Sequence, residues 1–247
     1  MLKKSFLLLL IIMLFTLPLI TKAQQANNKI AYGETASGEI TNRNFEIAYD
    51  FVGKKGDVIV VEMKPVDKFG DLNSPAIILL DADADVIADT SSIFVIGSTA
   101  LATKLRSDGT YTILATRNDG RAGTSVGEFT LALIQPTLLE PKETTKDTVS
   151  SEDETKYYLI EGGSEPIGFT YHKISGEYSP EISVNIINDN FGLSEIITLR
   201  GSALEKGMVE IPAAARTSFI VKIGAPLFNF SFEESNANYE VTTTINA

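Results

Sequence analysis

Short runs of strand-forming residues, each bounded by turn residues, recur along most of this chain. Val, Ile, Phe, Tyr and Thr alternate with polar residues in these runs or stand in short groups, and Gly, Asn, Asp and Pro separate the runs. No sustained helical period interrupts them, so the pattern predicts a sandwich or barrel of short strands. The runs of the first half are NFEIAYDF (44–51), DVIVVEMK (57–64), AIILLD (76–81), TYTILATR (110–117) and EFTLALI (128–134). Those of the second half are KYYLIEG (156–162), IGFTYHKIS (167–175), EISVNIIND (181–189), EIITLRG (195–201), MVEIPA (208–213), SFIVKIGA (218–225) and NYEVTTTI (238–245).

The second half repeats the pattern of the first. Ser74-Pro75 matches Ser179-Pro180, Tyr111 matches Phe219 and Phe129 matches Tyr239, at offsets of 105, 108 and 110 residues. A period of this length suits one small sandwich. The expected fold is therefore all-β, with two tandem antiparallel, jelly-roll-like β-sandwich domains.

A polar segment with two prolines, residues 135–154, marks the join between the repeats. Its composition suits a short linker followed by an entering strand. The expected division is listed along the chain as a signal peptide (1–23), a first sandwich (24–136), a linker with an entering strand (137–154) and a second sandwich (155–247).

The first residues have the form of a secretory signal peptide. Lys3 and Lys4 precede an apolar run from Phe6 to about Ile20, and a small residue, Ala23, stands where cleavage is expected. The alternative is an uncleaved membrane anchor, because the run is only slightly shorter than the roughly 20 residues that cross a bilayer. Either way we expect an exported protein, located in the periplasm, at the cell surface or outside the cell.

Charge and cysteine content narrow the possible partners. The chain has no cysteine and a formal charge of −11, which becomes about −14 when the three lysines of residues 1–23 are removed. An exported chain without disulfides depends on core burial for its stability. The negative charge argues against nucleic acid, which proteins bind by neutralising phosphates with Lys and Arg. Cations, basic partners or simple solubility fit the charge better.

The first repeat resembles the bacterial pre-peptidase C-terminal domain family. The resemblance rests on a glycine-led opening, a strand that ends in an aromatic residue, a Lys-Gly-Asp turn and two later strands, and it covers about residues 33–135. The matching segments are Gly38-Glu39-Ile40, FEIAYDF (45–51), Lys55-Gly56-Asp57, GDLNSPAIILLDADADVIA (70–88), LRSDGTYTILATR (105–117) and GEFTLALI (127–134). Over about 139–246 the likeness is weaker, because IPAAARTSFIVKI (211–223) replaces the Asp-Gly-Thr-Tyr element.

This resemblance implies a secreted, non-catalytic β-sandwich module. Members of the family are usually attached to peptidases, and some bind calcium or matrix polymers. No catalytic domain accompanies the sandwiches in this sequence, so the appendage role does not transfer unchanged.

The sequence offers little for catalysis. Its one histidine, His172, is expected to face solvent or to pack on a sheet, opposite Tyr171 and Lys173. No nucleophile elbow, phosphate-binding glycine loop or zinc motif is present. A hydrolase that uses two carboxylates remains a remote alternative, because the chain has many acids and none of them stands out as a pair. We therefore expect no enzyme and no cofactor.

The segment LLDADADVIADT (79–90) is a candidate calcium-binding loop, because four aspartates lie in it. Asp81, Asp83 and Asp85 have the spacing that opens an EF-hand loop, but Val86 and Ser92 stand where that loop needs glycine and glutamate. The simpler interpretation is a hairpin with a polar turn. A calcium site of another kind at the three aspartates stays open, because clustered carboxylates repel one another unless a cation intervenes.

Three phenylalanines alternate in APLFNFSFEESNANY (225–239). Phe228, Phe230 and Phe232 are expected on one side of an extended segment. They fill a core or a seam between the sandwiches, or they form a ridge that binds a partner.

The function expected is that of a non-catalytic accessory protein of the cell envelope. Its sandwiches would bind another envelope protein or an extracellular polymer through their loops and edge strands. The alternative is a calcium-stabilised module that binds matrix or glycan.

Overall fold

The computed structural model describes most of the chain beyond the leader. The described residues are 28–91, 97–150, 154–176, 180–188, 192–199, 206–212, 217–224 and 236–245. The predicted signal peptide and Phe228, Phe230 and Phe232 lie outside them. Within these residues, no helix has the length and apolar character to cross a membrane.

The first nine strands form two sheets that face each other. Sheet A has the strand order β1-β3-β8-β5-β6 and sheet B the order β2-β9-β4-β7. Neighbouring strands are antiparallel except β1 and β3, which pair in parallel. The strands are β1 (Asn28–Lys29), β2 (Thr35–Ile40), β3 (Ile47–Gly53), β4 (Val58–Pro65), β5 (Pro75–Leu80), β6 (Val86–Asp89), β7 (Thr99–Lys104), β8 (Gly109–Arg117) and β9 (Gly127–Ile134), with a 3-10 turn η1 (Gly120–Ala122) before β9.

The next nine strands repeat this arrangement. Sheet C has the order β10-β12-β17-β14-β15 and sheet D the order β11-β18-β13-β16, so every strand holds the place of the strand nine before it. Here too one pair, β10 with β12, is parallel. The strands are β10 (Thr137–Leu138), β11 (Thr144–Val149), β12 (Thr155–Glu161), β13 (Ile167–Ser175), β14 (Glu181–Asn188), β15 (Gly192–Leu199), β16 (Lys206–Ile211), β17 (Ser218–Gly224) and β18 (Ala237–Ile245). The expected all-β fold of two tandem sandwiches is confirmed. The residues between the repeats already supply β10 and β11 to sheets C and D.

Strand registers align the two sandwiches residue by residue. Tyr111 pairs with Phe51 on β3, and Phe219 pairs with Ile160 on the equivalent strand β12. The strand order thus equates Tyr111 with Phe219, as the sequence predicts. Each sandwich buries its own apolar core between its two sheets.

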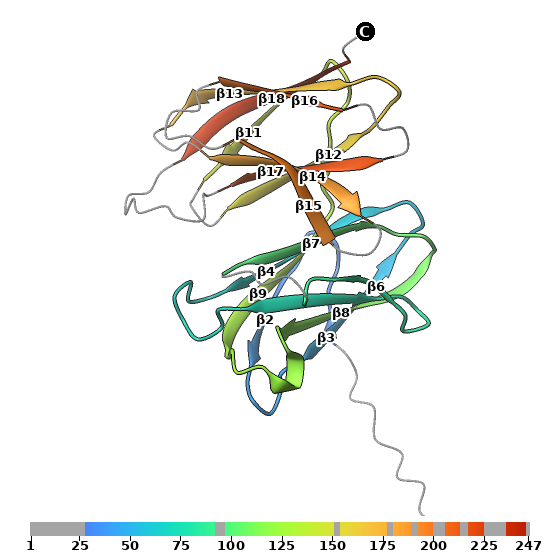
Figure 1. Cartoon of the computed structure of the whole chain (residues 1–247), viewed down its shortest axis with the longest axis vertical. Helices are drawn as coiled ribbons and strands as arrows, with labels where there is room; N and C mark the ends of the chain where they lie inside the picture. Colours follow the sequence, from blue (N-terminus) through green and yellow to red (C-terminus); the bar gives the residue numbers. More distant parts are fainter. Residues whose placement is uncertain are drawn as a thin grey trace, which may run out of the picture.

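The two sandwiches stack into four layers, A, B, C and D, in which sheet B packs on sheet C. A third apolar cluster lies between them, formed by Val58, Val60 and Ala102 of sheet B and by Tyr157 and Ile220 of sheet C. Figure 1 shows this stack, with β13, β18 and β16 at one end and β3 and β8 at the other.

Strand β4 is buried on both faces because of this stacking. Ile59, Val61 and Met63 belong to the core of the first sandwich, whereas Val58 and Val60 belong to the cluster between the sandwiches. A strand covered on both faces needs apolar residues at successive positions. The run VIVV supplies them, which explains why this strand departs from simple alternation.

Candidate functional site

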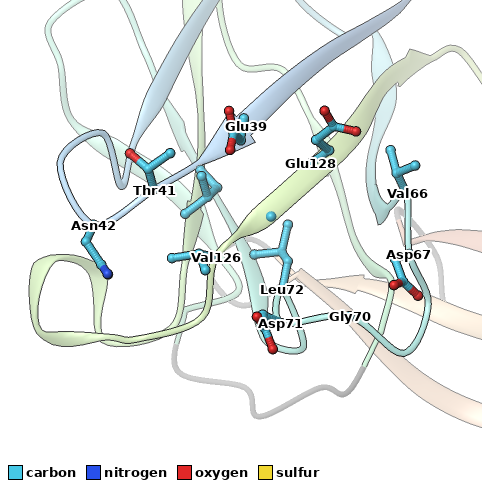
Figure 2. A pocket seen from close by; sticks show the side chains of 12 residues that line it. Glu39, Thr41, Asn42, Val66, Asp67, Gly70, Asp71, Leu72, Val126 and Glu128 are labelled. Atoms are coloured by element: carbon cyan, nitrogen blue, oxygen red, sulfur yellow. The ribbon is translucent and has the colours of Figure 1, made fainter.

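An open cleft of about 470 Å³ lies at one end of the first sandwich. Its walls come from three segments that are distant in sequence: the end of β2, the loop between β4 and β5, and the start of β9 (Figure 2). The lining residues are Glu39, Ile40, Thr41, Asn42, Val66, Asp67, Gly70, Asp71, Leu72, Val126, Gly127 and Glu128.

Backbone hydrogen bonds hold the cleft walls together. The amide of Val66 donates to the carbonyl of Glu128 at 3.0 Å, and the amide of Val126 donates to the carbonyl of Asp71 at 3.2 Å. Within the β4–β5 loop, Asp67 Oδ1 accepts from the amide of Phe69 at 3.0 Å. This hydrogen bond closes a turn of the kind that Asp favours.

Arg117 holds the loop before β9 against the loop after β2 by hydrogen bonds. Its side chain is only 1% exposed, so its charge needs nearby oxygen acceptors. Nε donates to the carbonyl of Gly120 at 2.8 Å, and Nη1 donates to the carbonyl of Ser125 at 2.9 Å and to Asn42 Oδ1 at 3.1 Å. Because Asn42 and Ser125 lie on different loops, Arg117 ties two walls of the cleft together.

The cleft is acidic around an apolar floor. Ile40 and Leu72 are buried, and four exposed carboxylates surround them, with no Lys or Arg among the lining residues. The carboxylates are those of Glu39, Asp67, Asp71 and Glu128. Glu39 and Glu128 are direct cross-strand partners, an arrangement of like charges that destabilises a sheet on its own. A cationic ligand would relieve that repulsion.

Two exposed apolar side chains belong to the segment after β4 that also supplies Asp67 and Asp71. Phe69 is 96% exposed and Val66, which lines the cleft, is 60% exposed. An aromatic ring this exposed gives up the free energy of burial, about 2 kcal/mol or more for Phe. A loop with exposed acids and exposed apolar side chains suits a partner that carries both positive charge and apolar surface.

A second groove, of about 540 Å³, lies along the seam between sheets B and C. One of its three lining glutamates, Glu62, is 5% exposed and accepts from the Tyr157 hydroxyl at 2.7 Å, while Lys64 Nζ lies 2.9 Å from the other oxygen of Glu62. Burial, reinforced by Glu62, raises the pKa of Tyr157 well above 10.0. Lys64 also donates to Thr155 Oγ1 at 3.3 Å. These polar groups satisfy one another and join the two sandwiches, so we assign the groove a structural role.

The three aspartates predicted as a possible metal site lie at the β5–β6 turn. Asp81 Oδ1 accepts from the amides of Asp83 and Asp85, at 3.0 and 2.9 Å. The hairpin itself is confirmed, since β5 and β6 pair antiparallel and Ala84 takes the left-handed conformation of a tight turn, with φ 64°. Asp81 therefore acts as the hydrogen-bond acceptor of its own turn. Throughout the residues that the structure describes, no three His, Cys, Asp or Glu side chains gather as a metal site would require.

His172 lies on the outer face of sheet D. Its Nδ1 is 3.1 Å from Glu240 Oε1 across the β13–β18 pair, and its side chain is 49% exposed, as the strand alternation predicts. The alternating phenylalanines Phe228, Phe230 and Phe232 fall outside the described residues, so neither interpretation of them is tested.

The cleft itself is not among the sites predicted from the sequence. Its acids come from three strands and loops, and nothing local in the sequence brings Glu39 beside Asp71. The available signal is Phe69, an aromatic residue placed within the polar loop DKFGDLN (67–73).

Comparisons with known proteins give likeness only at the level of overall structure. No family model matches the chain, and no curated protein matches it. A pre-peptidase C-terminal domain of a collagenase from Bacillus anthracis is similar over 44% of this chain and 95% of its own, with 14% identity and a TM-score of 0.34. Tandem family 51 carbohydrate-binding modules of a glycoside hydrolase from Streptococcus pneumoniae are similar over 80% of each chain, with 9% identity and a TM-score of 0.25. A tandem pair of family 22 modules from Paenibacillus barcinonensis is similar over 80% of this chain and 82% of its own, with 12% identity and a TM-score of 0.30. At these TM-scores the likenesses assign neither a family nor a function to the chain.

Proposed function

We propose that this chain is an exported, non-catalytic accessory protein of the cell envelope, and that it binds a partner protein through the acidic cleft of its first sandwich. The proposal includes a signal peptide over residues 1–23, a first domain of the pre-peptidase C-terminal type over 24–136, and a second such domain that follows the 137–154 segment. The observation that carries it is the cleft: four carboxylates around an apolar floor, with an almost fully exposed phenylalanine in one of the loops that line it.

The chemistry of the cleft favours a basic, partly apolar segment of a protein over the other expected ligands. Lys or Arg side chains would neutralise Glu39 and Glu128, and their ammonium or guanidinium groups can also lie against the ring of Phe69. Such a segment would cover Val66 and Phe69 and so remove their apolar surface from water. The long-range field of an acidic protein would speed the approach of a basic partner.

Titration of a synthetic peptide of alternating Lys and Leu residues tests the proposal. The peptide binds the wild-type protein in low salt, and we expect its affinity to fall at least about tenfold when the cleft acids are neutralised, because each lost ion pair contributes about 0.2 to 1 kcal/mol. The cleft variant combines Glu39→Gln, Asp67→Asn, Asp71→Asn and Glu128→Gln. Asn at position 67 keeps the oxygen that accepts from the amide of Phe69.

A control variant removes the same number of charges elsewhere. It combines Asp83→Asn, Glu140→Gln, Glu143→Gln and Glu165→Gln, none of which lines the cleft. We expect this variant to bind the peptide nearly as well as the wild type. An equal loss of peptide affinity in both variants would show that net charge alone governs binding and that the cleft is not the binding site.

The calcium-stabilised alternative has its own measurement. If Asp81, Asp83 and Asp85 held calcium, the melting temperature would rise with added calcium and fall with chelator. We expect no such change, because Asp81 Oδ1 already accepts two hydrogen bonds within its own turn.

A further inference from the structure

The first sandwich carries a protruding basic turn at the end opposite the acidic cleft. The chain turns between β3 and β4 over residues 54–57, where the amide of Asp57 donates to the carbonyl of Lys54 at 3.1 Å. Gly56 has a φ of 92°, as the third residue of a type II turn requires. A Cβ on Gly56 would meet no atom within 4 Å, so the turn projects into open space.

The two lysines of this turn are available for a partner. Lys54 and Lys55 are exposed, and neither ammonium group forms an ion pair or a hydrogen bond with another described residue. The neighbouring acids accept from backbone amides instead: Asp57 Oδ2 from Lys54 at 3.1 Å, and Asp108 Oδ1 from Lys55 at 2.8 Å. Val52, two residues before the turn, is 73% exposed. The segment therefore offers positive charge together with apolar surface, the combination that suits the cleft.

The described residues of the second sandwich repeat neither the basic turn nor the acidic pair of the cleft. The β12–β13 loop, which holds the place of the β3–β4 turn, reads Gly162-Gly163-Ser164-Glu165-Pro166 and has one acid and no base. The cross-strand pair Glu39–Glu128 of the cleft is replaced by the equivalent pair Thr148–Asn238. There, Thr148 Oγ1 donates to Asn238 Oδ1 at 2.7 Å, so a neutral hydrogen bond stands in place of two like charges. The acidic cleft and the basic turn thus occur together, in the first sandwich.

The turn and the cleft of one chain lie too far apart to meet. Strand β4 begins at Val58, directly after the turn, and ends at Pro65, directly before the loop that lines the cleft. A strand of 8 residues is about 26 Å long. A contact between this turn and a cleft therefore needs two copies of the chain.

We propose that the partner of the cleft is a second copy of this chain, whose 54–57 turn enters the cleft head to tail. This inference rests on the proposed function, because it names the partner of the same cleft. Lys54 and Lys55 of one copy neutralise carboxylates of the next, such as those of Glu39 and Glu128. The same contact can repeat from copy to copy, which builds an open row of molecules unless the row closes into a ring. The formal charge of −11 on each chain opposes association at long range, but salt at about 0.15 M screens charges beyond about 8 Å.

Sedimentation equilibrium of the protein purified from the envelope tests this proposal. The salt is kept at about 0.15 M, and the protein concentration is raised to about 500 µM because small contacts between proteins are weak. The turn variant combines Lys54→Gln and Lys55→Gln. We expect the weight-average mass of the wild type to rise past that of a dimer. The turn variant alone and the cleft variant alone should each associate at least about tenfold more weakly, because each lacks one side of the contact.

An equimolar mixture of the two variants tests the direction of the contact. The turn variant keeps an intact cleft and the cleft variant keeps an intact turn, so each pair of molecules can form one contact. The mixture should therefore reach the mass of a dimer and stop there. A wild type that keeps the monomer mass, a turn variant that associates like the wild type, or a mixture that stays monomeric overturns the proposal.

The matched control combines Lys142→Gln and Lys146→Gln, which removes two exposed lysines that lie outside the turn. It should associate like the wild type. If it loses as much association as the turn variant, net charge and not the turn governs association, and the proposal is overturned.

The Lys-Leu peptide separates this inference from the proposed function. The turn variant keeps the cleft, so it should bind the peptide as the wild type does. A wild type that binds the peptide but does not self-associate would leave the cleft as a binding site and exclude a second copy as its partner. A wild type that does not bind the peptide would overturn the proposed function itself.

Discussion

At the residue scale, the two sandwiches place different residues at one equivalent position, on strands β2 and β11. In the first, Gly38 lies against two rings, and a Cβ at this position would come within 2.6 Å of Phe129 and 2.8 Å of the Tyr49 hydroxyl. In the second, the equivalent of Gly38 is Asp147, whose Oδ2 accepts from the Tyr158 hydroxyl at 2.8 Å. The first sandwich thus depends on the absence of a side chain at a place where the second uses a carboxylate.

Gly38→Ala is therefore expected to destabilise the first sandwich by about 1–3 kcal/mol, because the added methyl group overpacks the contact with Phe129. Urea unfolding followed by tyrosine fluorescence measures the change, since the chain has no tryptophan. Gly163→Ala serves as the control, because its Cβ would meet only the amide of Glu165, at 3.9 Å. Equal stability of Gly38→Ala and the wild type would contradict the packing argument.

At the element scale, strands β4 and β12 carry the link between the sandwiches. The hydroxyl of Tyr157 on β12 and the carboxylate of Glu62 on β4 form a buried hydrogen bond across the seam. Burial first, and then the charge of Glu62, holds the pKa of Tyr157 well above 10.0. A group whose pKa is raised by folding contributes full stability below its unfolded pKa and loses that contribution as the pH rises toward its folded pKa.

The link is therefore expected to weaken at alkaline pH. The free energy of unfolding should fall above pH 10, and burial alone also raises the pKa of Tyr171, to about 12. Tyr157→Phe should cost about 1 kcal/mol at pH 8 through the lost hydrogen bond, and its stability should fall less steeply above pH 10. Denaturation at a series of pH values gives the free energy of unfolding, and absorbance at 295 nm gives the fraction of tyrosine that is ionised. Identical slopes for the variant and the wild type would exclude Tyr157 as a source of the alkaline loss.

Alternation and turn residues predict the strands well, but not how the strands stack. The run at 167–175 coincides with β13, and the runs at 110–117 and 128–134 each miss only the first residue of β8 and β9. Strand β7 (Thr99–Lys104) is missed, because its alanines have little strand preference. The stacking of sheets B and C also escapes prediction, since alternation assigns one face of each strand to water and cannot show that Val58 and Val60 meet Ile220.

At the scale of the whole molecule, the outer faces of sheets A and D form the two ends of the stack, and the acidic cleft opens at one end of the first sandwich. Net charge is readable from the sequence, but its concentration around the cleft arises only when β2, β9 and the β4–β5 loop come together. The proposed binding of a basic partner depends on this concentration of charge.

Affinity capture from the native envelope measures whether the cleft binds such a partner. Wild-type protein, the neutralised cleft variant and the control variant with four charges removed elsewhere are used as baits under the same salt concentration. We expect one stoichiometric protein with a basic segment to be recovered with the wild type and the control, and to be lost with the cleft variant. Recovery of that protein with all three baits, or of no stoichiometric partner with any of them, would show that the cleft does not bind a protein partner.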